Sequence, residues 1–116
     1  TINVAAPDPN VVGHFYEQLL GWNVAIDEPG WMIVRPPGGG VGISSEFDEA
    51  YVAPTWPSEP GKPSQMLHLE IKVDDLEAAV AYATSIGARL AEYQPQEDVR
   101  VCLDPAGHPF CLWLGS

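Results

Sequence analysis

Basic residues are scarce in this chain of 116 residues: five Lys and Arg stand against 16 Asp and Glu, which gives a net charge of −11. A nucleic-acid-binding surface needs a basic patch to neutralise phosphates, and an anionic membrane surface attracts the same kind of patch. The composition therefore argues against nucleic acid and membrane as partners. It favours a neutral or cationic ligand over an anionic one.

Long apolar runs are missing, and cysteine is rare. No run approaches the roughly 18 apolar residues that a membrane-spanning helix needs, and no signal peptide is visible. The two cysteines, Cys102 and Cys111, are too few for a disulfide framework. We therefore expect a reduced, cytoplasmic protein. The chain begins at Thr1 without a methionine, so what precedes it in the full-length protein is left open.

Hydrophobic residues make up 46% of the chain, which includes four tryptophans. This content is typical of a folded globule, and 116 residues can bury a core without crosslinks. We expect one domain over residues 1–116.

One stretch, residues 66–73, shows clear alternation between apolar and polar side chains. Leu67, Leu69, Ile71 and Val73 alternate with polar residues that include a histidine and a glutamate. A period of two predicts a half-buried strand. His68 and Glu70 are then expected on the face that does not pack against the core.

The order strand–helix–strand–strand–strand occurs twice, which indicates an internal duplication with a period of about 67 residues. Each helix is expected to begin at an aspartate N-cap, Asp8 or Asp74, with Glu77 completing a capping box, and to end at Gly21 or Gly87. The expected strands are 1–6, 22–26, 31–35 and 41–45 in module one (1–45), and 66–73, 89–93, 99–103 and 110–114 in module two (66–116). The proline-rich residues 46–65 are expected to form a linker or flap, in which Trp56 is either a lid, a dimer contact or a hydrophobic plug.

This duplicated pattern resembles the vicinal oxygen chelate superfamily, which contains glyoxalase I, the bleomycin-resistance proteins and the extradiol dioxygenases. The resemblance covers essentially the whole chain, and FYEQLLGW (15–22) and LDPAGHPF (103–110) carry it. The segments APDP (6–9), TWP (55–57), MLHL (66–69) and GHPFC (107–111) are similar to small bacterial glyoxalase-like domains. The resemblance implies an α+β fold in which two βαβββ modules form an open cup-shaped barrel, and it implies a homodimer.

Metal-using members of that superfamily take ligands from the first and last strands of each half. His68 matches one of these positions, whereas Thr1, Ser44 (or its neighbour Ile43) and Cys111 occupy the other three. A zinc or iron site needs three or more converging N, O or S donors. We therefore expect no standard metal site and no cofactor. The alternative is a divalent metal held by His68 together with one or more of Glu46, Glu70 and Cys111.

The resemblance leads us to expect a small-molecule site in the cleft between the modules. Its predicted lining is Asn3, Ser44, Trp56, His68, Glu70, Arg100, Cys111 and Trp113. Cys111 as a nucleophile would need a lowered pKa, and the acidic chain offers few cations near it apart from Arg100.

The leading interpretation is metal-independent binding of a small molecule, of the sequestration type. One alternative is an enzyme, either a metal-dependent lyase, isomerase or dioxygenase with a remodelled site, or a metal-free isomerase in which His68 acts and Glu70 orients it. Another is a domain that serves only in dimer assembly. Whether the chain is an enzyme and which ligand or substrate it takes are open at this point.

Overall fold

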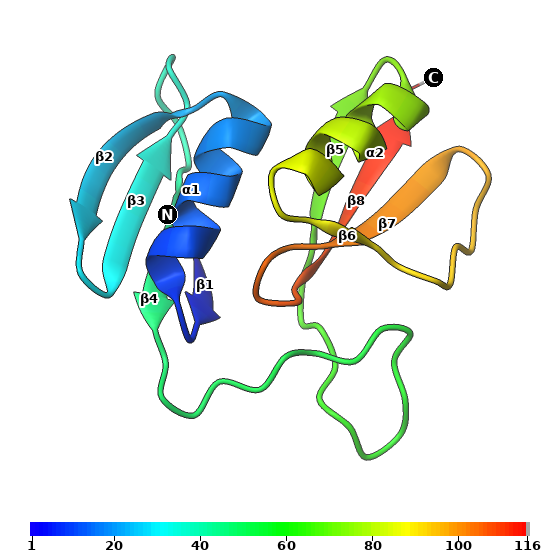
Figure 1. Cartoon of the computed structure of the whole chain (residues 1–116), viewed down its shortest axis with the longest axis horizontal. Helices are drawn as coiled ribbons and strands as arrows, with labels where there is room; N and C mark the ends of the chain where they lie inside the picture. The colour runs from blue at the N-terminus through cyan, green and yellow to red at the C-terminus, as the bar shows by residue number, and fades with distance from the viewer. Residues whose placement is uncertain (116) are drawn as a thin grey trace. The chain divides into compact units, whose positions relative to one another are not determined.

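The computed structural model describes residues 1–115 and contains two compact units, unit 1 (Thr1–Tyr51) and unit 2 (Val52–Ser116). Each unit is a four-stranded mixed sheet with one helix, in the order βαβββ (Figure 1). The expected α+β class and its two βαβββ modules are confirmed. Among the described residues, no helix has the length and apolar character needed to cross a membrane.

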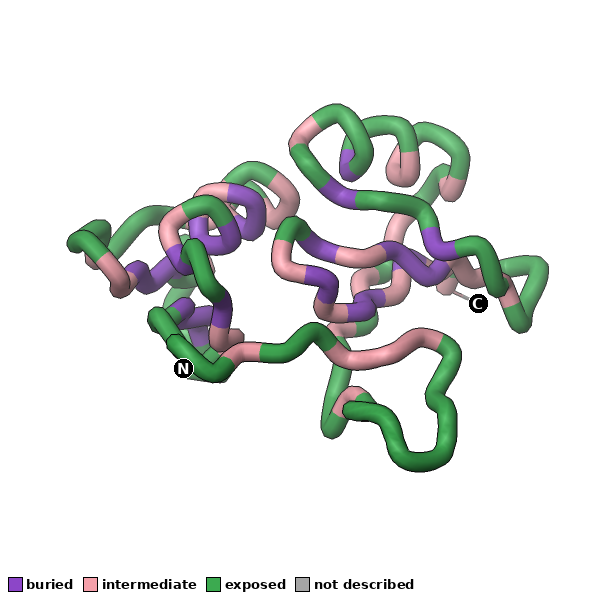
Figure 2. The backbone as a smooth tube through the Cα atoms, turned by 60° about the horizontal axis from the view of Figure 1, so that its bottom comes forward, coloured by how far each residue is buried: buried purple, intermediate pink, exposed green. Residues whose placement is uncertain are grey.

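The sheet of unit 1 has the strand order β1-β4-β3-β2, in which β1 runs parallel to β4 and the other pairs are antiparallel. Its elements are β1 (Ile2–Ala6), α1 (Pro9–Leu20), β2 (Asn23–Glu28), β3 (Trp31–Arg35) and β4 (Ile43–Phe47). Helix α1 covers one face of this sheet and buries Val12, Phe15 and Tyr16 against β3 and β4. The buried residues of this core are drawn purple in Figure 2.

The sheet of unit 2 repeats the arrangement with the order β5-β8-β7-β6 and the same parallel first pair. Its elements are β5 (Leu69–Val73), α2 (Leu76–Ser85), β6 (Arg89–Leu90), β7 (Val99–Leu103) and β8 (Pro109–Leu114). Phe110 and Leu112 of β8 and Cys102 of β7 form its core together with Ala83 of α2. The expected internal duplication is therefore present at the level of topology.

The C-terminal end of α1 agrees with the prediction, and the N-terminal end of α2 differs from it. Gly21 follows α1 in the left-handed conformation with φ of 66°, as expected of a helix-terminating glycine. At the start of α2, the N-cap is Asp75, whose side chain accepts a 3.0 Å hydrogen bond from the Ala78 amide. The predicted capping box from Asp74 to Glu77 is therefore wrong by one residue, because α2 begins at Leu76 and Asp75 is the residue directly before it.

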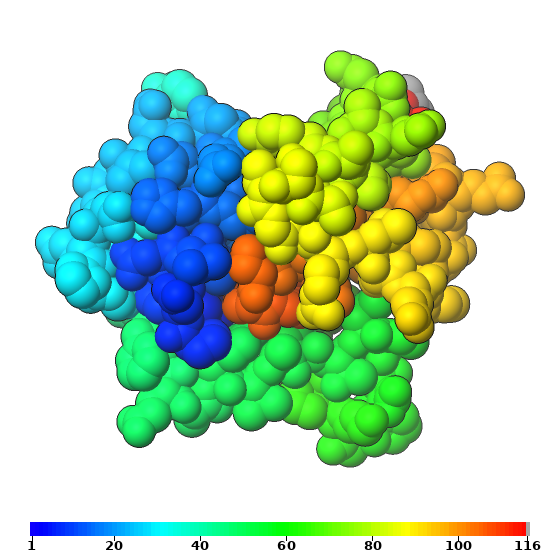
Figure 3. All heavy atoms as spheres, viewed as in Figure 1, coloured from blue at the N-terminus to red at the C-terminus, as the bar shows by residue number. Residues whose placement is uncertain are grey.

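The proline-rich segment is divided between the units. Strand β4 extends to Phe47, and residues 52–65 belong to unit 2, where their atoms lie on the surface (green in Figure 3). The Thr55 amide donates to the Pro63 carbonyl at 2.8 Å, which closes a loop. Trp56 fixes this loop to unit 2, because its indole Nε1–H donates to the Tyr93 carbonyl at 3.2 Å and the two rings lie 6.1 Å apart.

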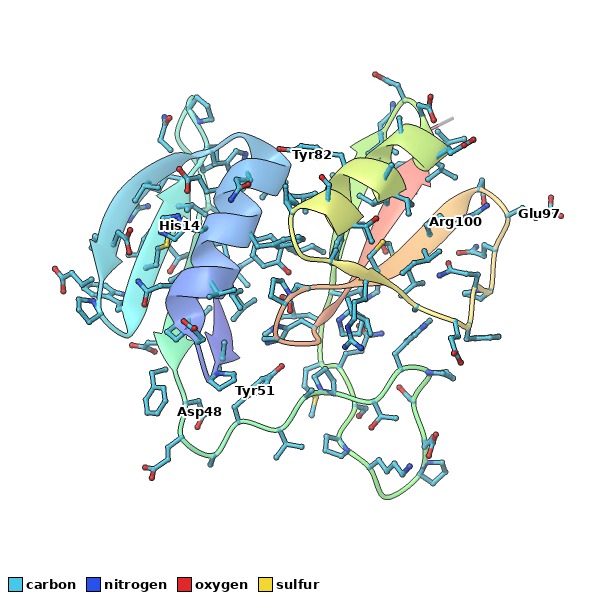
Figure 4. The ribbon with its side chains drawn as sticks, in the orientation of Figure 1. His14, Asp48, Tyr51, Tyr82, Glu97 and Arg100 are labelled. Atoms are coloured by element: carbon cyan, nitrogen blue, oxygen red, sulfur yellow. The ribbon has the colours of Figure 1, made fainter. Side chains whose placement is uncertain are left out.

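His14 links α1 to the edge strand β2 in unit 1 (Figure 4). Its Nδ1 lies 2.7 Å from Glu17 Oε1, and its Nε2 lies 3.0 Å from Asp27 Oδ2. The hydrogen bond with Glu17, followed by the charge of Asp27, raises the pKa of His14 above its ordinary value of 6.5 despite partial burial. The imidazolium form therefore favours the folded state.

This raised pKa predicts a pH-dependent contribution to stability. The contribution should be complete below pH 6.5 and should disappear as the pH rises through the higher pKa of the folded state. Because all three side chains are partly exposed, we expect it to stay below about 1 kcal/mol. Urea unfolding between pH 5 and pH 8 measures it, and His14→Gln should remove this part of the pH dependence. An unchanged pH dependence in His14→Gln would contradict the assignment.

Candidate functional site

The duplication places four equivalent side chains on the sheet face opposite the helix in each unit. In the parallel pairs, Asn3 is opposite Ser44 and Glu70 is opposite Cys111, so one offset of 67 residues relates both pairs. This register identifies Ser44, rather than Ile43, as the counterpart of Cys111. The four equivalences are Thr1 with His68, Asn3 with Glu70, Ser44 with Cys111, and Glu46 with Trp113.

In unit 1 these four side chains form a hydrogen-bonded polar cluster. Ser44 is buried, and its Oγ lies 3.0 Å from Thr1 Oγ1 and accepts from Asn3 Nδ2 at 3.2 Å. The same amide donates to Glu46 Oε2 at 3.4 Å. Asn3 and Ser44, both predicted to bind ligand, are therefore brought together, and their hydrogen-bonding groups are largely satisfied by one another.

In unit 2 the equivalent face carries a pocket of about 480 Å³. Most of its wall is apolar or aromatic, with a few polar groups among them. The lining residues are Trp56, His68, Glu70, Pro95, Gln96, Val99, Val101, Cys111 and Trp113. A mostly apolar cavity of this size with few polar groups is typical of a site for a small organic molecule.

His68 and Glu70 form the polar side of this pocket. His68 Nε2 lies 3.3 Å from Glu70 Oε1, and Glu70 is the more exposed of the two side chains. His68 directly precedes β5, which begins at Leu69, so the strand is shorter than the predicted 66–73. A carboxylate beside a histidine can orient the imidazole and support proton transfer.

Cys111 lies in the pocket wall as a neutral thiol. Burial, and then the charge of Glu70, raise the pKa of Cys111 above its ordinary value of 9.0. Such a thiol is a poor nucleophile at neutral pH. Cys102 lies on the other face of the sheet, since it pairs with Phe110 while Cys111 pairs with Val101, and burial raises its pKa to about 11.

Two tryptophans contribute aromatic surface to the pocket. Trp56 reaches it from the loop of residues 52–65, and Trp113 reaches it from β8. The Trp113 indole Nε1–H is shielded from solvent and has no hydrogen-bond partner among residues 1–115. A buried donor without a partner is rare, because it loses its bond to water without replacing it.

Arg100 is not part of this pocket. It follows Val99 and precedes Val101, which both line the pocket, so it points to the opposite face of β7 and lies beside α2 with Leu76 and Val80. Its Nη1 donates to the carbonyls of residues 96, 97 and 99, at 3.4, 2.8 and 2.8 Å, next to Glu97 at the loop tip (Figure 4). The predicted placement of Arg100 in the pocket lining is wrong, because alternation along β7 sends neighbouring side chains to opposite faces.

Four lining residues were not predicted: Pro95, Gln96, Val99 and Val101. The two valines could have been found from the sequence, because alternation along β7 puts them on the same face of the sheet as Cys111, which pairs with Val101. Pro95 and Gln96 belong to an irregular loop between β6 and β7 and carry no periodic signal.

The resemblance to metal-using proteins raises the question of whether the donors present can hold a divalent metal. Within residues 1–115, no group of three or more His, Cys, Asp or Glu side chains has the arrangement of a metal site. In the pocket of unit 2, His68 has one carboxylate beside it, that of Glu70, and the thiol of Cys111 favours its protonated form. The donor set therefore does not fit the three-ligand minimum of a zinc or iron centre.

The chain is similar to one known domain family and to several solved structures. A model of the glyoxalase-like domain matches residues 1–113. A glyoxalase/bleomycin resistance protein/dioxygenase family enzyme from Burkholderia phytofirmans PsJN has a similar structure, with a TM-score of 0.68 and 19% identity over 96% of this chain and 93% of that chain. None of the curated proteins matches the sequence.

Two similar structures are proteins connected with antibiotics. The fosfomycin resistance protein FosX from Mesorhizobium loti has a TM-score of 0.69 and 13% identity, covering 99% of this chain and 89% of that chain. TnmS3, an antibiotic binding protein from Streptomyces sp. CB03234, has a TM-score of 0.52 and 21% identity, covering 100% of this chain and 96% of that chain. At these identities the likeness establishes a common fold and leaves activity to be argued from the site.

Proposed function

Because the chain belongs to the glyoxalase-like domain family, we propose that it binds a small organic molecule in the pocket of unit 2 without the help of a metal ion. The observation that carries this proposal is the pocket itself, which combines about 480 Å³ of space with aromatic and aliphatic walls and a few polar groups. The antibiotic-binding neighbour lends further support, since the same fold is used there for binding.

The polar residues of the pocket fit binding better than they fit metal chemistry. His68, Glu70 and Gln96 offer both donors and acceptors for hydrogen bonds with a ligand. Cys111 remains a neutral wall residue because its pKa is raised. A protein of this kind would sequester its ligand, since apolar contact holds the molecule and no reactive group attacks it.

A thermal-shift screen of small molecules is the first test of this proposal. A ligand that binds only the folded state at 100 times its Kd adds about 2.7 kcal/mol of stability, which raises the Tm by several degrees. Hits should be checked with metal-free protein and with protein supplied with zinc or manganese. Binding that needs the metal would contradict metal independence.

Trp56→Ala should raise the Kd of any such ligand by about tenfold or more, because it removes the aromatic side chain that the loop of residues 52–65 contributes to the pocket wall. Isothermal titration calorimetry measures the change in Kd. Trp22→Ala, in unit 1, is the matched control for loss of a tryptophan and should leave the Kd unchanged. Equal effects of the two substitutions would exclude the pocket as the binding site.

The 3.3 Å contact between His68 and Glu70 favours a second candidate, a metal-free enzyme that moves a proton. In this reading His68 takes a proton from a carbon acid and Glu70 keeps the imidazole oriented. Incubation of a bound ligand in D₂O, followed by NMR, would reveal exchange of a C–H proton. Exchange that His68→Gln abolishes, with little change in Kd, would favour the enzyme over the sequestering protein.

We also propose that the chain acts as a cytoplasmic homodimer, in line with the proteins it resembles. Light scattering coupled to size-exclusion chromatography gives the mass directly. A mass of 12.5 kDa at micromolar concentration would contradict the dimer.

A further inference from the structure

We propose that the pocket of unit 2 selects an organic cation: a molecule with a flat or apolar body, a positively charged nitrogen and a nearby hydrogen-bond acceptor. This inference rests on the proposed binding function and adds the chemical class of the ligand. It comes from the charges and aromatic groups of the pocket wall and from the solvent-shielded indole N–H of Trp113, which has no hydrogen-bond partner among residues 1–115.

Among the described residues that line the pocket, Glu70 is the only one with a carboxylate. Within the described part of the chain, no Lys or Arg lines the pocket. Arg100, the expected cation, lies on the other face of β7 and donates to backbone carbonyls. Lys72 shares the face of Glu70, but its side chain lies against Gly115 and is not in the lining. A carboxylate or phosphate group on a ligand would find no Lys or Arg in this lining, and the imidazole of His68 lies 3.3 Å from the Glu70 carboxylate.

The thiol of Cys111 responds to the same negative charge. Its raised pKa has Glu70 as a cause after burial, so the carboxylate acts at the pocket wall despite its partial exposure. An ammonium or guanidinium group placed between them would gain attraction from Glu70. The net charge of −11 on the whole chain adds long-range attraction of the same sign.

The two tryptophans supply the other half of the recognition chemistry. Indole faces attract cations through their ring electrons and also pack against flat apolar groups. Trp113 adds its unpartnered Nε1–H, which can donate to an oxygen or nitrogen of the ligand once the side chain adjusts to it. The Glu70 carboxylate, the two indoles and the unpaired N–H of Trp113 together match a cation that carries a hydrogen-bond acceptor.

Three probes with the same body and different charge test this inference: 2-(1-naphthyl)ethylamine, 2-(1-naphthyl)ethanol and 1-naphthylacetate. Binding is followed by ¹H–¹⁵N NMR, in which the indole N–H signals of Trp56 and Trp113 report directly on the pocket. We expect the amine to bind about threefold to tenfold more tightly than the alcohol, a modest factor because Glu70 is exposed to water and salt. The carboxylate should bind more weakly than both.

Two substitutions separate the contributions. Glu70→Gln keeps the shape of the side chain and removes its charge. In this variant the amine should bind with about the same affinity as the alcohol. Glu77→Gln changes the net charge by the same amount outside the pocket, on α2, and should preserve the preference for the amine. Trp113→Phe keeps an aromatic ring but removes the Nε1–H and part of the indole surface, so it should weaken binding of both the amine and the alcohol, and of the amine more, because indole attracts cations better than phenyl does.

The outcomes distinguish this inference from the function on which it rests. If all three probes bind with similar affinity, or the carboxylate binds best, the pocket binds small molecules and the cation preference is wrong. If Glu77→Gln reduces the preference as much as Glu70→Gln, the preference comes from the overall charge and the role of Glu70 is wrong. If no probe shifts the two indole signals at millimolar concentration, both proposals fail.

Discussion

Replacing Asp104 with alanine is expected to lower the free energy of unfolding by about 3–5 kcal/mol, as for other broken buried networks with a charged member. Asp104 lies between β7 and β8 and is 1% exposed. Its Oδ1 accepts from the amides of Ala106 and His108 at 2.9 and 3.0 Å, and its Oδ2 lies 2.7 Å from His108 Nδ1. Alanine would leave these donors inside the turn without their acceptor.

Asp104→Asn is the matched control for this prediction. Its amide oxygen can still accept from the two backbone amides, whereas the charge that faces His108 is lost, so we expect a smaller loss of about 1–2 kcal/mol. Urea unfolding followed by circular dichroism measures both variants. A loss below 1 kcal/mol for Asp104→Ala would mean that water replaces the carboxylate and that the turn does not depend on it.

Gly13→Leu should destabilise unit 1 by about 2–3 kcal/mol, which is in the range of overpacked cores. Gly13 lies on the buried side of α1, and a Cβ atom there would meet Met32 Cγ at 2.7 Å and Met32 Cβ at 3.0 Å. Met32 is fully buried, so moving its side chain would displace other core atoms. The gain in helix propensity from replacing glycine, about 1 kcal/mol, is too small to offset this clash.

The partner of the clash can be tested directly. Met32→Ala alone should cost about 2–5 kcal/mol by leaving a cavity, but in the Gly13→Leu background it should cost much less, because the leucine fills that space. Val11→Leu, at a half-exposed position of the same helix, is the control and should change stability by less than about 0.5 kcal/mol. Additive losses in the double variant would show that Met32 is not what the added side chain meets.

The fold could be predicted from the sequence because its signals are local and occur twice. Alternation in 69–73 and the glycine after α1 each reflect a backbone requirement that the residue type alone reveals. The order of strands and helix along each half was predicted from the sequence and is confirmed, whereas the pairing of strands within each sheet was not predicted. The helix cap was misplaced because two adjacent aspartates, Asp74 and Asp75, both suit an N-cap, and the end of the strand at Val73 leaves both possible.

The candidate site was harder to predict, because it depends on which strands are neighbours. His68, Glu70, Cys111 and Trp113 were found on one face, since period-two alternation fixes faces within a strand and the duplication relates the strands. The side of the sheet on which Arg100 lies follows from the pairing of Val101 with Cys111: Val101 shares the face of Cys111, so its neighbour Arg100 lies on the other face. The prediction for Arg100 was wrong because this pairing was not part of it. Gln96 lies in an irregular loop that has no periodic pattern, and its carbonyl accepts a side-chain hydrogen bond from Arg100 that residue type alone does not reveal.

The repeated register also makes the chain suitable for transplanting a site from one half to the other. Thr1, Asn3, Ser44 and Glu46 occupy the backbone positions that hold the pocket residues of unit 2. The quadruple variant His68→Thr, Glu70→Asn, Cys111→Ser and Trp113→Glu would give unit 2 the polar face of unit 1 on an unchanged scaffold. Comparing this variant with the natural chain would separate the contribution of the pocket side chains from that of the backbone geometry that both units share.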